Sequence, residues 1–192
     1  MNELPSRNYA ALTAERHAIR GFTLFEMVTV MGIVGILMAI AIPSYQYVTS
    51  SNRISSEVNG LLGDLEFARS EAIKEGQTVS VCVSSNGTSC TSGTSWQNGW
   101  IVFSDQNGDG AVESPPDIIL RTQNTFSGTD TFTANNNLSV VKFNREGFAA
   151  GLPNGALLTL HAATPASGST RCLSVTLIGL MTIQTYNGGT CT

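Results

Sequence analysis

Two kinds of hydrophobic pattern follow one another along the chain. The stretch Phe22–Ile42 is almost continuously apolar, with Glu26 as its one ionisable residue. A run of about 20 apolar residues is long enough to cross a membrane as a helix. After Pro43 the apolar residues recur at helical spacing, which predicts a kinked but continuing amphipathic helix that stops at Gly76. They are Ile54, Val58, Leu61, Leu62, Leu65, Ala68, Ala72 and Ile73.

Short apolar or alternating runs in the rest of the chain predict β-strands. The runs are Val79–Val83, Trp100–Phe103, Ile118–Leu120, Val140–Phe143, Leu157–Leu160, Leu173–Leu177 and Met181–Ile183. Asn-Gly pairs, which favour tight turns, lie among them. The pairs begin at Asn86, Asn98, Asn154 and Asn187. We therefore expect an α+β fold, in which a long N-terminal helix packs on an antiparallel sheet that curls against it.

The charge distribution argues against nucleic acid as a partner. Charged residues are 12% of the chain, about half the usual share for a soluble protein. The net charge is −4, and three of the ten basic residues precede the apolar run, namely Arg7, Arg16 and Arg20. A protein whose main partner is nucleic acid usually carries a basic patch. The sequence from Phe22 onward is acidic instead.

The sequence also offers no pattern typical of an enzyme. It contains no GxSxG, phosphate-binding loop or HExxH motif. After the apolar run the only histidine is His161, which lies in a strand-like segment. We expect a surface or half-buried structural histidine there. Trp96 and Trp100 are close enough to stack on a ligand, but core packing is the ordinary role of such residues.

Cysteine usage favours an oxidising compartment. The four cysteines fall into two pairs that are close in sequence, and they are Cys82, Cys90, Cys172 and Cys191. Behind an export-type segment, this arrangement favours two local disulfides, 82–90 and 172–191. A zinc site is the alternative, but the chain has no CxxC and its two histidines lack ligand spacing.

One acidic loop partly matches a calcium-binding sequence. Asp105, Asn107 and Asp109 place oxygen atoms at alternate positions, as in the first half of an EF-hand loop. The second half fails, because Pro115 and Pro116 stand where the bidentate Glu belongs. Asn, Asp and Gly also form turns for local reasons. We therefore expect a polar turn and no cofactor, with weak Ca²⁺ binding as the alternative.

The N-terminal pattern leaves three interpretations. A cleaved signal peptide fits the small residues Ala39 and Ala41, but Pro43 would follow that cut directly. A plain single-pass anchor fits the length of the run but gives no reason for Glu26, since a charge in a lipid-facing helix costs at least about 2.5 kcal/mol. The third interpretation rests on a resemblance.

The run from Arg20 to Glu26, Arg-Gly-Phe-Thr-Leu-Phe-Glu, resembles the class III leader of type IV pilins and of type II secretion pseudopilins. The resemblance implies that a prepilin peptidase cuts after Gly21 and that the new N-terminal Phe22 is methylated. It also implies an assembly role for Glu26 and a helix kink at Pro43. Within a bundle of such helices, the Phe22 ammonium of one subunit can pair with a Glu26 carboxylate of another and set the axial register.

The later segments resemble the GspH/FimT branch of this superfamily. The resemblance rests on Cys82 and Cys90, on the stretch Trp96–Asp105 and on Ile118–Arg121. It implies a pilin-like fold and a minor pilin that primes or caps a type IV pilus, or else a minor pseudopilin of type II secretion. A third alternative is a tip module that binds DNA or a surface. The sequence Gly179–Thr182 lacks the arginines that some pilus members carry there, which disfavours DNA.

Together these observations give four expected segments. They are a basic leader (1–21), a membrane and polymerisation helix (22–43), an amphipathic continuation (44–76) and a β-rich head (77–192). The implied partners are other pilins or pseudopilins, the prepilin peptidase and an inner-membrane assembly platform. The implied location is the bacterial inner membrane with the head in the periplasm, and then the pilus or pseudopilus.

Overall fold

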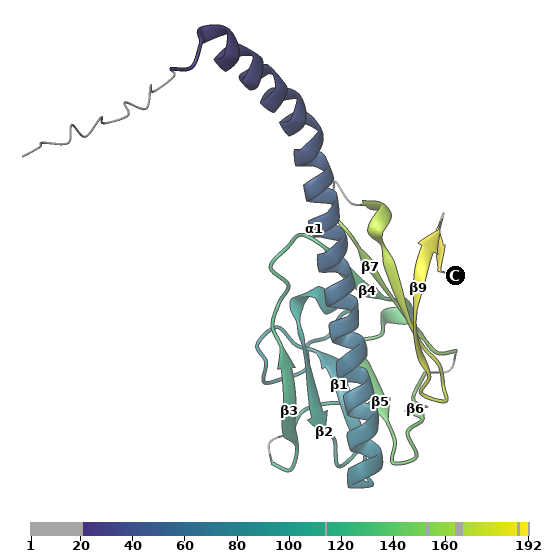
Figure 1. The fold of residues 1–192 in the computed structure, drawn as a ribbon. Helices are drawn as coiled ribbons and strands as arrows, with labels where there is room; N and C mark the ends of the chain where they lie inside the picture. Colours follow the sequence, from purple (N-terminus) through teal and green to yellow (C-terminus); the bar gives the residue numbers. More distant parts are fainter. Residues whose placement is uncertain (1–20, 114, 153, 164–166, 188, 192) are drawn as a thin grey trace, which may run out of the picture. The chain divides into compact units, whose positions relative to one another are not determined.

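The computed structural model describes residues 21–113, 115–152, 154–163, 167–187 and 189–191. The chain divides into two compact units, residues 1–41 and 42–192. Most of the expected leader, residues 1–20, lies outside the described residues. Figure 1 shows the elements of both units.

Helix α1, Leu24–Glu75, begins in the first unit. The Thr23 hydroxyl accepts a hydrogen bond of 3.2 Å from the Glu26 N–H, so Thr23 caps the first turn. Threonine followed three residues later by glutamate is the sequence of a capping box. Among the described residues, α1 is the one helix long and apolar enough to cross a membrane, and no part of its most apolar window is buried.

The rest of α1 belongs to the second unit. It runs through Pro43 without ending, in agreement with the sequence expectation, whereas the kink remains a prediction. It ends before Gly76, whose φ of +70° is easy for glycine and whose N–H bonds to the Ala72 carbonyl at 3.0 Å. The buried helix residues form one stripe, namely Ser50, Ile54, Val58, Leu61, Leu65, Ala68 and Ala72.

The first sheet has the strand order β3-β2-β1-β5-β6 and is antiparallel throughout. Its strands are β1 (Val79–Val83), β2 (Trp100–Ser104), β3 (Ile118–Gln123), β5 (Val140–Phe143) and β6 (Ala149–Ala150). Every residue of β1 and β2 is buried, which agrees with the apolar run expected for β2, whereas β1 was expected from an alternation of apolar and small polar residues.

The second sheet has the order β10-β9-β8-β7-β4 and is also antiparallel. Its strands are β4 (Thr131–Ala134), β7 (Ala156–His161), β8 (Arg171–Val175), β9 (Met181–Asn187) and β10 (Thr190–Cys191). Short 3₁₀ helices connect several strands: η1 (Trp96–Asn98), η2 (Asn135–Asn137) and η3 (Ser167–Ser169).

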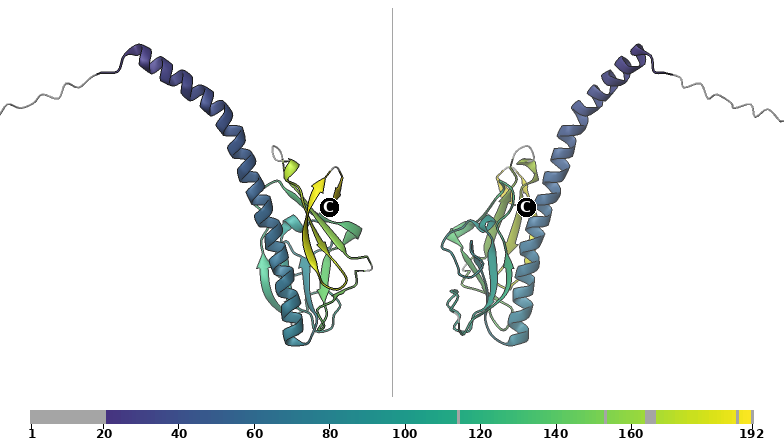
Figure 2. Two further views of the ribbon diagram at one scale, coloured as in Figure 1. Left: turned by 45° about the vertical axis from the view of Figure 1, so that its right-hand side comes forward. Right: turned by 90° about the vertical axis from the view of Figure 1, so that its left-hand side faces the viewer.

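Both sheets lie on the same side of the second-unit part of α1 (Figure 2). One core of buried side chains joins the helix stripe to the two sheets, with Leu61 from α1, Trp100 from β2 and Leu158 from β7 among its largest members. The expected α+β fold is confirmed. The expected single curled sheet is instead two sheets of five strands each.

Candidate functional site

The apolar half of α1 presents its side chains outward. Phe22 is 76% exposed, and Glu26 is exposed in the first turn of the helix. A carboxylate at this position also lies near the positive end of the helix dipole. The structure thus places Phe22 and Glu26 about one turn apart at the start of an unpacked apolar helix. Such a helix can contact lipid or other apolar helices along its whole circumference.

Among the described residues, polar contacts at three positions, Arg53, Asp64 and Arg69, hold the other half of α1 to the head in addition to the apolar stripe. Near its start, Arg53 Nε donates to Asp130 Oδ2 at 2.6 Å. In the middle, Asp64 accepts from the Trp100 indole at 2.8 Å and from Arg121 at 3.0 Å.

Near its end, Arg69 Nε donates to the Gly147 carbonyl at 2.9 Å, and its Nη2 lies 3.4 Å from the Ile178 carbonyl. A Cβ on Gly179 would meet the Gly147 carbonyl and the Arg69 guanidinium. The turn between β8 and β9 can therefore approach the helix this closely only with glycine at position 179. This turn begins the Gly179–Thr182 segment, in which some pilus members carry arginines. In this chain the turn holds the end of the helix.

The first contact includes a second carboxylate. Glu57 Oε1 lies 3.9 Å from Arg53 Nε, but the guanidinium already bonds to Asp130. Burial and, second to it, the nearby Asp130 charge raise the pKa of Glu57, whereas Arg53 lowers it, and together these effects bring the pKa to about 7. The bond to Asp130 correspondingly raises the pKa of Arg53. No local sequence pattern indicates this cluster, because 77 residues separate Arg53 from Asp130.

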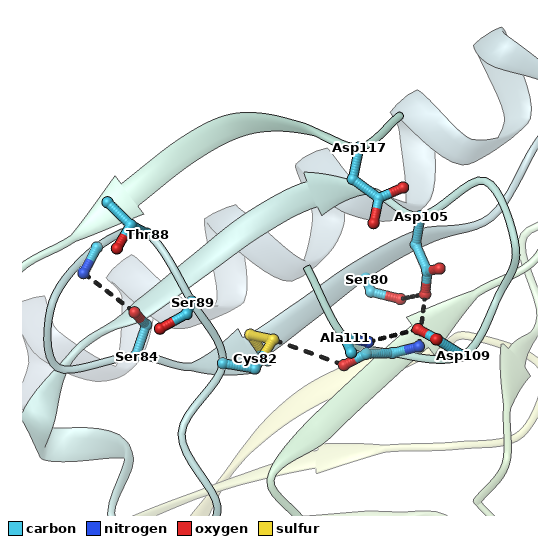
Figure 3. Close-up of a disulfide and its surroundings, with 12 residues drawn as sticks. Ser80, Cys82, Ser84, Thr88, Ser89, Asp105, Asp109, Ala111 and Asp117 are labelled. Carbon is cyan, nitrogen blue, oxygen red and sulfur yellow. Dashed lines mark hydrogen bonds between the residues drawn. A yellow bond between two sulfur atoms is a disulfide. The ribbon is translucent and has the colours of Figure 1, made fainter. Parts of the chain in front are cut away.

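Two disulfides link the four cysteines. Cys82 on β1 bonds to Cys90 in the following loop, and Cys172 on β8 bonds to Cys191 on β10. The first disulfide lies beside the acidic loop, with Cys90 Sγ 3.5 Å from the Gly110 carbonyl (Figure 3). The second joins a central strand of its sheet to the edge strand β10.

The acidic loop is held by its own hydrogen bonds. The buried Asp105 carboxylate accepts from the Ser80 hydroxyl at 2.6 Å (Figure 3). It also accepts from the N–H groups of Gly108 and Gly110 at 2.8 and 2.9 Å. Asp109 accepts from the Ala111 N–H at 2.7 Å.

The Asn107 side chain bonds within the same loop, its oxygen accepting from the Asp109 N–H and its nitrogen donating to the Asp109 and Glu113 carboxylates. The buried Asp117 closes the loop by accepting from the N–H groups of Gln106 and Glu113. These bonds are those of a polar turn, and within the described residues no group of His, Cys, Asp and Glu side chains could hold a metal.

The aromatic residues belong to the core. Trp96 and Trp100 are almost completely buried, with ring centroids 6.5 Å apart. Their indole N–H groups bond to the Leu138 carbonyl and to Asp64. His161 is half-buried on β7 with its ring edge-on to Tyr186 at 5.6 Å. The core position expected for the two tryptophans is confirmed.

Two family models match the chain. The family described as "Type II transport protein GspH" matches residues 57–179, which is most of the head and the end of α1. The "Prokaryotic N-terminal methylation motif" matches residues 16–42, which include Gly21, Phe22 and Glu26.

Individual relatives match over shorter stretches. A fimbrial protein of Pseudomonas aeruginosa is 42% identical over 62 residues, 32% of this chain and 40% of the relative. A type IV major alpha-pilin of Moraxella bovis is 43% identical over 63 residues, 32% of this chain and 38% of the relative. These matches therefore span less than half the length of the curated relatives.

A solved structure extends the likeness over the head. The crystal structure of the type IV minor pilin FimU of Pseudomonas aeruginosa has a TM-score of 0.56 at 20% identity, and the match covers 76% of this chain and 96% of that one. At this identity the likeness is one of fold.

Proposed function

This chain belongs to the family described as type II transport protein GspH, and from that membership we propose that it is a minor pilin that helps to prime or cap a type IV pilus. The observation that carries the proposal is the division of one helix into two halves. Residues 21–49 are exposed, whereas the stripe from Ser50 to Ala72 is buried in a folded head. A helix of this kind can join a bundle of similar helices while it carries the head outside the bundle.

Processing precedes assembly in this proposal. A prepilin peptidase cuts between Gly21 and Phe22, and the new amine of Phe22 is methylated. The match of the methylation motif to residues 16–42 supports this step. Cleavage also removes the arginines of the leader, which would otherwise hold the N-terminus at the cytoplasmic face. The apolar helix is then free to leave the membrane.

Glu26 sets the register of the assembled helix. Both the Phe22 ammonium and the Glu26 carboxylate are costly in an apolar bundle unless they are paired. Because Glu26 lies in the first turn of α1, a small axial shift between neighbouring helices can bring it to the Phe22 amine of the next subunit. The partners implied by this contact are other pilins.

The proposed location is the bacterial inner membrane, with the head in the periplasm, followed by incorporation into the fibre. The two disulfides support a head in an oxidising compartment. An inner-membrane assembly platform is the further partner that this route requires.

A second candidate function is that of a minor pseudopilin of the type II secretion machine. The description of the matching family, a type II transport protein, favours it. The two candidates share the same helix, processing and register, and they differ in the fibre that the subunit enters. Deletion of the gene distinguishes the two candidates. Loss of surface pili supports the minor pilin, and loss of export of secreted enzymes supports the minor pseudopilin.

The experiment that tests assembly is Glu26→Ala, with Glu66→Ala on the exposed face of α1 as the control. Mass spectrometry of the membrane fraction is expected to show both variants beginning at methylated Phe22. Glu26→Ala is expected to stay in the membrane, whereas Glu66→Ala enters sheared fibres or the secretion complex. Incorporation of Glu26→Ala at the wild-type level would disprove the register role, and a chain beginning at Met1 would disprove the processing step.

A further inference from the structure

A hollow of about 380 Å³ lies beside the middle of the second-unit part of α1. Glu57 and Gly60 line it on the helix side, and Trp100 and Phe126 line it on the side of the head. No sequence pattern indicated this hollow, because its walls come from α1, β2, the end of β3 and the loop after it.

The Glu57 carboxylate in its wall lacks a full set of partners. The side chain is only 11% exposed. Its Oε2 atom is buried, and among the described residues it has no hydrogen-bond partner. Arg53 does not supply one, because its Nε lies 3.9 Å from the other oxygen, Oε1, and donates to Asp130 at 2.6 Å. A buried carboxylate with an unpaired oxygen is costly, so a cation that contacts the carboxylate where it lines the hollow gains a strong interaction.

The aromatic walls are already fixed in place. The Trp100 indole is held by its bond to Asp64, and the Phe126 ring meets it edge-on with centroids 5.8 Å apart. The Phe126 N–H bonds to the Gln97 carbonyl at 3.0 Å, which positions the loop. Aromatic faces attract organic cations, most strongly where water is excluded.

We propose that this hollow binds an alkylammonium group, which pairs with Glu57 and packs against the partly exposed Phe126 ring, behind which lies the buried Trp100. The group can come from a lysine side chain of a neighbouring protein or from a small organic cation. A bare metal ion fits less well, because Ca²⁺ requires six to eight oxygen ligands and the hollow offers one carboxylate. Binding of this kind does not depend on the proposed function, since the hollow lies within the head of a single chain.

The titration of Glu57 agrees with this assignment. Burial, and then the charge of Asp130, raise its pKa to about 7, and Arg53 opposes this only in part. A bound ammonium favours the ionised form and lowers the pKa again. Binding is therefore expected to be stronger at pH 8 than at pH 5.5.

The test uses the full chain in detergent, titrated with n-butylammonium chloride and followed by tryptophan fluorescence and the melting temperature. Sodium chloride at equal ionic strength and n-butanol are the controls. A saturable response to butylammonium is expected, weakened by about tenfold or more in Glu57→Gln, which corresponds to about 1.4 kcal/mol. Phe126→Leu is a second variant, expected to weaken binding while it leaves the pH dependence of Glu57 in place.

The proposal is overturned if butylammonium acts no differently from sodium, or if Glu57→Gln, shown by circular dichroism to be folded, binds it equally well. If binding is observed, carbodiimide cross-linking of native membranes identifies the source. A Glu57–lysine cross-link to another subunit supports a protein ligand. Binding without that cross-link supports a free organic cation.

Discussion

The Trp100 indole N–H and the Arg121 guanidinium share the Asp64 carboxylate, with Trp100 bonded to Oδ2 at 2.8 Å and Arg121 to Oδ1 at 3.0 Å. Trp100 lies on β2 and Arg121 on β3, so a single helix side chain bonds to two neighbouring strands of the first sheet. The Arg121 guanidinium also lies 3.7 Å from the centre of the Phe67 ring on the same helix. The orientation of α1 on this sheet therefore depends on Asp64 as well as on apolar packing.

Asp64→Ala is expected to lower the free energy of unfolding by about 1–3 kcal/mol, because the buried indole N–H loses its acceptor. Asp64→Asn keeps an oxygen that can accept from Trp100 but removes the charge that faces Arg121. Its decrease in the free energy of unfolding is therefore expected to be smaller than that of Asp64→Ala. Glu66→Ala, on the exposed face of the helix, is the control and is expected to change little. Urea unfolding followed by tryptophan fluorescence measures all three. An equal effect of Asp64→Ala and Glu66→Ala would contradict the role given to Asp64.

Glu57 makes the stability of the head depend on pH. Its pKa is about 7 in the folded chain and near 4.5 when unfolded, so the folded state holds the proton more tightly between these values. Stability is therefore expected to fall as pH rises from about 4.5 to 7, by on the order of 2 kcal/mol, and to level off above that range. Glu57→Gln is expected to remove most of this slope. Melting curves from pH 4.5 to 8.5 measure it, and equal slopes for the two proteins would show that other groups cause the dependence.

Gly179 and Gly63 form a matched pair for substitution by alanine. Gly179 has a φ of +74°, and a Cβ there would meet the Gly147 carbonyl, so Gly179→Ala is expected to cost about 1–3 kcal/mol. Gly63 lies in α1, and a Cβ added there would have no neighbour within 4 Å, so Gly63→Ala is expected to stabilise the chain by about 0.5–1 kcal/mol. Thermal unfolding compares the two variants, and a stabilising Gly179→Ala would contradict the proposed turn geometry.

The disulfides are both expected to stabilise the head, and the one that closes the longer loop only slightly more. Their cysteines are 8 and 19 residues apart, which corresponds to about 2.5 and 3 kcal/mol in the chain-entropy description. Paired replacement by serine, Cys82 with Cys90 or Cys172 with Cys191, separates the two contributions in melting experiments. Peptide mapping without reductant is expected to recover only these two links, and a Cys82–Cys172 peptide would refute them.

The sequence was informative wherever a local pattern determines the structure. The buried stripe of α1 follows the helical spacing from Ile54 to Ala72. The helix ends before Gly76, as expected, and this glycine adopts a positive φ that other residues rarely adopt. Strand β2 was visible as an apolar run because all its residues are buried. The strand expected at Leu173–Leu177 instead spans Arg171–Val175, because residues 176–180 form a hydrogen-bonded turn.

Other features depend on contacts between distant residues and could not be predicted locally. Strand β4 reads Thr-Phe-Thr-Ala, a pattern too short and polar to separate from a loop, and β6 and β10 have two residues each. The division into two sheets depends on β1 pairing with β5 rather than with β4. The Arg53–Asp130 bond and the hollow at Glu57 likewise require the folded head, so only their residue types were visible in the sequence.

The burial of α1 begins at Ser50, and the residues before it, from Gly21 to Thr49, are exposed. The core of the head therefore does not use them, and its stability is independent of whether they are surrounded by lipid or by other helices. The apolar half of α1 can therefore exchange one apolar environment for another without any refolding of the head.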